Sequence, residues 1–151
     1  MKQLLLVSWL LSLSAILGLP EVKADVRMPL IFGNHMVLQQ DTRITIWGWA
    51  DAGENIEVLF AGQKVRTTAN ADGTWQGKLK PVKTKKKGET LTITGKNKLV
   101  YSDVLVGDVW VASGQSNMEW GIKVRKEYAD DIAHSEDSLL RLFFVPKNTS
   151  L

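Results

Sequence analysis

Short runs of alternating apolar and polar residues fill the chain between residues 25 and 105. In the run 74–79, for example, Trp75, Gly77 and Leu79 fall on one face of an extended chain and the polar residues fall on the other. Turn residues recur about every eight to twelve positions, which is typical of a β-sandwich. The pattern predicts a β-sandwich domain over 25–105, with strands at 44–49, 56–60, 64–69, 74–79, 89–94 and 98–105.

After these strands the pattern changes. Residues 108–112 resemble a buried strand, residues 123–135 a polar helix, and residues 140–145 a second buried strand. A strand, a helix and a strand form the opening unit of an α/β sheet. Two strands and one helix leave both sheet faces uncovered and cannot stand alone. We therefore predict that 106–151 is the start of a truncated α/β domain.

The amino terminus has the pattern of a secretory signal peptide. Lys2 is followed by an apolar run over 4–19, and small residues at Val22 and Ala24 suit a signal peptidase. A membrane anchor is the alternative, but the run is short of the roughly twenty residues that a bilayer span needs. We read 1–24 as a cleaved signal, which predicts a periplasmic or secreted protein without membrane attachment. The absence of cysteine removes disulfides and a lipidated cysteine.

Charge does not point to a particular partner. The chain has 19 basic and 16 acidic residues, and loss of the predicted signal leaves a net charge of +2. The basic stretch 83–88 lies between two predicted strands and has no interleaved aromatic residue to stack on bases. We read it as a solvated hairpin loop and expect no nucleic-acid partner. Asp103 and Asp108 bracket the domain junction, where we expect them to pair with Lys or Arg.

A serine on a tight turn is the main candidate for chemistry. Ser116 follows the predicted strand 108–112, and Gly114 permits the sharp reversal before it. A helix beginning near Asn117 would surround the hydroxyl with backbone N–H groups that stabilise an oxyanion. Gln115 would shape the turn, and Asn117 would cap the helix or border the oxyanion site. The alternative is that Ser116 is only a helix N-cap.

Two motifs resemble one known family. Residues 107–110 (Gly-Asp-Val-Trp) and 114–118 (Gly-Gln-Ser-Asn-Met) resemble the nucleophile block of the sialate O-acetylesterase family, part of the SGNH (GDSL-like) hydrolases. Residues 28–40 and 47–50 resemble the amino-terminal signature of the same family, in the right order. The resemblance implies an SGNH-type, flavodoxin-like α/β domain and a serine esterase. Its substrates would be O-acetylated sialic acid or related sugars, cleaved through an acyl-enzyme on Ser116, without a metal or organic cofactor.

A general base for this serine is harder to find. His35 lies in the amino-terminal signature, where we expect a packed or turn position. Asp131 and His134 have the Asp-x-x-His form of the base-bearing block, but a helix over 117–134 would separate His134 from Ser116 by up to about 27 Å. A base must come within roughly 3 Å. In the family the true Asp-x-x-His, with the oxyanion Gly and Asn, lies far downstream, so we expect this chain to be inactive by itself.

Two other functions remain open from the sequence. One is a non-catalytic carbohydrate-binding β-sandwich, which a downstream Gly, Asn and Asp-x-x-His would argue against. The other is an acetylxylan-type esterase of the same superfamily, which would use the same serine on plant polysaccharide. The preferred sugar, the acetyl position and the oligomeric state are left open as well.

Overall fold

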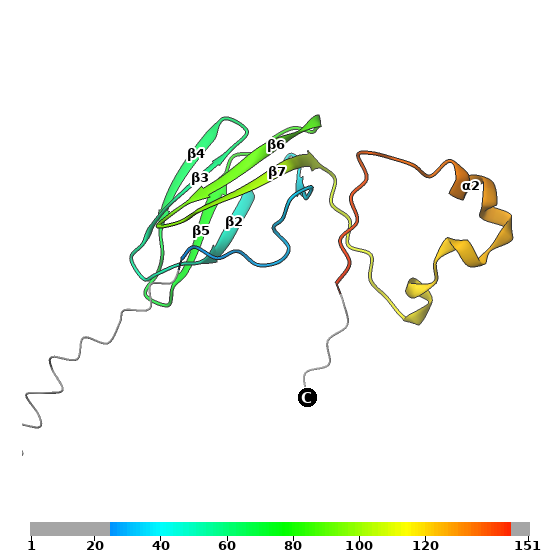
Figure 1. Ribbon diagram of the computed structural model, residues 1–151, viewed down its shortest axis with the longest axis horizontal. Helices are drawn as coiled ribbons and strands as arrows, with labels where there is room; N and C mark the ends of the chain where they lie inside the picture. Colours follow the sequence, from blue (N-terminus) through cyan, green and yellow to red (C-terminus); the bar gives the residue numbers. More distant parts are fainter. Residues whose placement is uncertain (1–24, 146–151) are drawn as a thin grey trace, which may run out of the picture.

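The structure, a computed structural model, describes residues 25–145, so the predicted signal peptide lies outside the described residues. The described residues form seven strands, three 3-10 turns and one short helix (Figure 1). The strands are β1 (Val37–Gln39), β2 (Ile44–Trp49), β3 (Asn55–Phe60), β4 (Gln63–Thr68), β5 (Thr74–Leu79), β6 (Lys85–Thr94) and β7 (Lys98–Gly107). The helical elements are η1 (Ser116–Glu119), η2 (Ile122–Val124), η3 (Lys126–Tyr128) and α2 (Ala129–Ala133).

The strands build two sheets. A five-stranded sheet has the order β1-β7-β6-β3-β4, and β2 and β5 form a separate antiparallel pair. All pairings in the larger sheet are antiparallel except that of β1 with β7. The predicted strands 44–49 and 74–79 are confirmed residue for residue, and the other four predicted strands are present with shifted ends. The three-residue β1 was not predicted, because so short a segment carries no readable period.

Both sheets contribute to one hydrophobic core. Ile46, Val58 and Leu91 are fully buried, and they come from β2, β3 and β6. A Cβ on Gly77 of β5 would lie 3.5 Å from Val58, so β5 packs directly on the larger sheet. Burial of each large apolar side chain stabilises the fold by about 1.5–3 kcal/mol. The prediction that the amino-terminal part is built of strands around an apolar core is confirmed.

The strands predicted after β7 do not form. No strand occurs in the described residues beyond Gly107, so the predicted strands at 108–112 and 140–145 are corrected. Trp110 and Leu142, one from each predicted strand, are 88% and 90% exposed. The reason is that a strand needs a hydrogen-bonding neighbour and a covered apolar face, and these segments have neither among the described residues.

The predicted helix over 123–135 is also corrected. The segment contains parts of η2, then η3 and the five-residue helix α2, and no residue of η3 or α2 is buried. Helical segments this short are marginal without a packed face. Figure 1 shows the segment after β7 running out from the strand domain and returning toward it. No helix in residues 25–145 is long and apolar enough to cross a membrane.

The basic stretch predicted as a hairpin loop partly belongs to a strand. β6 begins at Lys85, which lies opposite Val106, and the register then shifts before Glu89. The Thr84 hydroxyl donates to the Val106 carbonyl at 2.8 Å, which fixes the entry to β6. A Cβ on Gly88 would lie 2.7 Å from the Cα of Asp103 on the neighbouring strand β7. The irregular pairing at this point therefore needs glycine. The lysines remain exposed, as expected of a solvated segment.

Candidate active site

Ser116 lies on a tight turn that follows the last strand. After β7 ends at Gly107, residues 108–115 have no helix or strand, and Ser116 is the first residue of η1. The Met118 N–H donates to the Gln115 carbonyl at 2.9 Å, which closes the turn around the serine. A Cβ on Gly114 would lie 2.7 Å from the Met118 side chain, so this close approach favours glycine. Ser116 itself is exposed.

Two glutamines hold the chain as it leaves the sheet toward this turn. The Val109 N–H donates to Gln39 Oε1 at 2.8 Å, and Gln40 Nε2 donates to Asp108 Oδ1 at 3.0 Å. The Gln40 N–H also donates to the Gly107 carbonyl at 2.9 Å. The sequence alone indicates no role for these glutamines, although they end the amino-terminal signature. The expected basic partner of Asp108 is replaced by glutamine amides.

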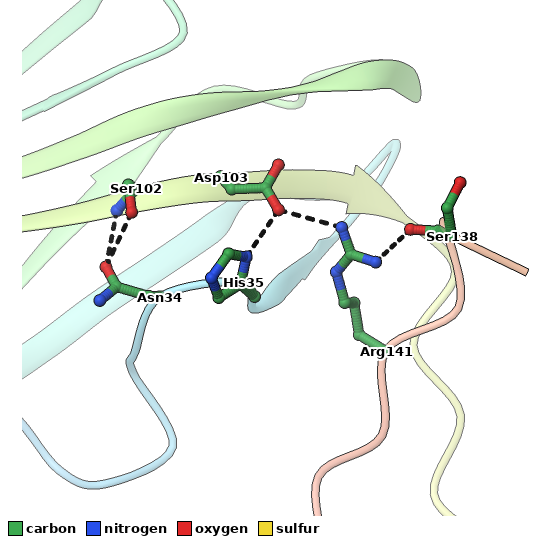
Figure 2. A network of polar contacts seen from close by, with 6 residues as sticks. All are labelled: Asn34, His35, Ser102, Asp103, Ser138 and Arg141. Carbon is green, nitrogen blue, oxygen red and sulfur yellow. Dashed lines mark hydrogen bonds and ion pairs between the residues drawn. The ribbon is translucent and has the colours of Figure 1, made fainter.

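His35 occupies the turn position that was expected of it. Its φ is +62°, and its N–H donates to the Ser102 carbonyl at 3.0 Å. Its Nδ1 lies 2.7 Å from Asp103 Oδ2 (Figure 2). The ring therefore faces a carboxylate on β7, and no hydrogen bond joins it to Ser116 in the described part of the chain.

His134 is engaged with its own backbone. Its Nδ1 lies 2.7 Å from the Asp130 carbonyl oxygen, one helical turn earlier, and the side chain of Asp131 is not its partner. His134 is exposed at the carboxyl end of α2. Because residues 117–134 do not form one continuous helix, the separation of 27 Å based on that helix does not apply. Still, nothing among residues 25–145 joins His134 to Ser116 by a hydrogen bond.

Asp103 joins the strand domain to the segment beyond it. Its Oδ2 accepts hydrogen bonds from His35 and, at 3.0 Å, from Arg141 Nη2 (Figure 2). The bond to His35 first, and the charge and bond of Arg141 after it, hold the pKa of Asp103 below its ordinary value. Arg141 also donates to the Ser138 carbonyl. The prediction that Asp103 pairs with a basic residue at the junction is confirmed.

The segment that carries Ser116 also carries several exposed apolar side chains. Trp110, Met118 and Trp120 are 88%, 55% and 72% exposed, an unusual exposure for large apolar side chains close together in sequence. Within residues 25–145 no group of three metal-ligating side chains comes together. The segment offers the hydroxyl of Ser116 on a glycine-containing turn, with exposed tryptophans nearby in the sequence.

The solved structures place the fold in a class. The chain resembles the crystal structure of a carbohydrate acetylesterase from Xanthomonas citri, with a TM-score of 0.68 and 34% sequence identity. The similarity covers 75% of this chain and 26% of that protein. The fold is that of part of a carbohydrate esterase.

Curated relatives name the family more narrowly. The chain is 36% identical over 128 residues to the sialate O-acetylesterase of Rattus norvegicus, and 35% identical over 127 residues to that of Mus musculus. Each match covers 74% of this chain, and the chain spans only 23% of either relative. No protein-family model matches the chain. The resemblance to the sialate O-acetylesterase family is confirmed.

Proposed function

We propose that the chain is the amino-terminal part of an exported serine esterase that removes O-acetyl groups from sialic acid or related acetylated sugars. The observation that carries this proposal is Ser116, exposed at the start of η1 on a glycine-containing turn, in a chain related to sialate O-acetylesterases. Neither feature alone would select an esterase, because a serine on a turn also serves as a helix cap.

The proposed reaction is acyl transfer to the serine. The Ser116 oxygen attacks the acetyl carbonyl carbon while a general base takes the hydroxyl proton. The backbone N–H of Ser116 donates to the oxyanion of the tetrahedral intermediate. The bond from the carbonyl carbon to the sugar oxygen then breaks, and the sugar leaves with the proton from the base. Water attacks the acetyl-serine in the same way and releases acetate.

The base and the remaining oxyanion donors are proposed to lie outside this chain. His35 is engaged with Asp103, and His134 with the Asp130 carbonyl. With neither histidine bonded to Ser116 in the described residues, the serine stays a weak nucleophile. We therefore propose that the 151 residues alone do not turn over substrate.

The strand domain is proposed to be a β-sandwich that positions the start of an SGNH-type α/β domain. The bonds from Gln39 and Gln40 to residues 108 and 109 support this role, because they fix the direction in which the chain leaves β7. The exposed apolar side chains of 110 and 142 belong to segments that would become strands when neighbouring strands cover them.

Acetate release from O-acetylated sialic acid tests the proposal. The assay compares the 151-residue chain with a form extended by the downstream residues that the relatives have. We expect release only from the extended form, loss of at least about a thousandfold with Ser116→Ala, and little change with the neighbouring Ser113→Ala. An extended form that keeps its activity with Ser116→Ala would refute the nucleophile assignment. Binding of the sugar without any release would favour the carbohydrate-binding alternative.

A further inference from the structure

Two tryptophans stand on the outward face of the β2–β5 pair. Trp47 and Trp49 alternate with buried residues along β2, and they remain 42% and 38% exposed. Their rings meet edge to face, with centroids 5.8 Å apart and planes at 74°. Phe32 packs edge-on against Trp47 at 6.3 Å, which supports the pair from the side. The two indoles thus form an exposed aromatic pair on the surface of the domain, and Phe32 packs against one of them.

Polar side chains line the same face beside the tryptophans. The antiparallel register sets Gln76 opposite Trp47 and Thr74 opposite Trp49, and it sets Lys78 next in the row of β5. On the other side of β2, the backbone of Arg27 forms an isolated antiparallel β-bridge with Trp49. Side chains of directly paired residues lie on the same face of a sheet. Aromatic and hydrogen-bonding groups therefore alternate across this surface.

The charged side chains on this face are positive, and they have no partner in the described part of the chain. Arg27 and Lys78 are the charged residues of the rows, and both are exposed. Within residues 25–145 the side chains of Arg27, Gln76 and Lys78 have no hydrogen-bond or ion-pair partner. A ligand for this face would therefore have an apolar side for the indoles, hydroxyls for Gln76 and a negative charge for the cations.

We propose that this face, defined by Arg27, Trp47, Trp49, Gln76 and Lys78, binds an acidic sugar ring. A pyranose has one apolar side of C–H groups that stacks on an indole, and its hydroxyls reach an amide. A carboxylate on the ring complements Lys78, which follows Gln76 in the row of β5, while Arg27 lies at the other end of the face, paired with Trp49. The choice of an acidic sugar rests on the proposed function, because sialic acid is such a sugar, and the face would hold a glycan chain at a second place, apart from Ser116.

Titration of the full chain with 3′-sialyllactose and with lactose tests this binding face. The measurement follows the indole N–H signals of the six tryptophans by NMR. We expect saturable shifts for Trp47 and Trp49 with sialyllactose, and at least fivefold weaker binding of the neutral lactose. Sialyllactose has no O-acetyl group, so a failure here would leave the esterase proposal standing, and an inactive Ser116 would leave this result unaffected.

Matched variants separate stacking from charge. Trp47→Ala should weaken sialyllactose binding at least tenfold, whereas Trp110→Ala, which removes an exposed tryptophan elsewhere, should not change it. Lys78→Gln should reduce the affinity for sialyllactose toward that for lactose, and this surface change should leave the unfolding midpoint in place. Absence of shifts at Trp47 and Trp49, or unchanged affinity in Lys78→Gln, would overturn the proposal. So would a wild-type dimer that Trp47→Ala converts to monomer, since a second copy would then occupy the face.

Discussion

Gly95 is a position where a single added methyl group should damage the fold. An ideal Cβ there would lie 2.3 Å from Glu54 Oε1 and 2.4 Å from Val26 Cγ2. Glu54 is only 8% exposed, and its carboxylate accepts the backbone N–H groups of Lys96 at 2.6 Å and Asp51 at 3.1 Å. The alanine must therefore displace a buried carboxylate that holds two turns together.

The size of the effect follows from these contacts. Overpacking of a well-filled site costs about 1–3 kcal/mol. A hydrogen bond to a charged group contributes about 1.5–3 kcal/mol, and the shift of Glu54 should break at least one. We expect Gly95→Ala to lower the free energy of unfolding by about 3–5 kcal/mol, which for a domain of this size lowers Tm by more than about 12 °C.

Urea unfolding followed by the tryptophan fluorescence of the chain, to which the buried Trp75 contributes, measures the loss. Gly33→Ala is the matched control, because nothing lies within 4 Å of its Cβ position and its φ is not positive. We expect that control to change stability by less than about 0.5 kcal/mol. If Gly95→Ala matched the control, the packing of Glu54 and Val26 around Gly95 would be wrong.

Other predictions concern the core and the junction. Leu91→Ala should cost about 2–5 kcal/mol because Leu91 is fully buried, whereas Val100→Ala, at a half-exposed site, should cost far less; equal urea midpoints would contradict the assigned core. His35→Ala should raise the pKa of Asp103 toward its ordinary 3.8, since the His35 bond is the largest cause of the lowered pKa. Because that pKa is lowered by folding, the stabilisation is complete above about pH 3.8 and is lost as the pH falls through the lowered pKa. An NMR titration of the Asp103 carboxyl carbon that is identical in both proteins would refute the contact.

The strand domain was predictable because each strand buries one face. In β5 the buried Trp75 and Leu79 alternate with exposed polar residues, and that period is visible in the sequence. The same reasoning failed for 108–112 and 140–145, whose apolar residues read as buried strands. Burial depends on neighbouring strands, and none covers these residues in the described part of the chain, so their apolar composition alone does not make them strands here.

The candidate site was predictable only in part. The glycine turn before Ser116 followed from local composition, because Gly114 and its neighbours are turn residues. The hydrogen bonds of Gln39 and Gln40 to the chain after β7 could not be predicted from the sequence, because they join residues about 70 positions apart. Such contacts depend on the parallel pairing of β1 with β7, which the short β1 did not reveal.

Labelling with a fluorophosphonate probe, mapped by mass spectrometry, tests the central assignment of Ser116 most directly. The probe forms a stable bond only with a serine that a base activates. We predict labelling on the peptide of residues 99–123 in a form extended to the length of the relatives, none in the 151-residue chain, and none with Ser116→Ala. Labelling of the short chain that disappears with His134→Ala would contradict the account, because it would show that the local histidine is the base.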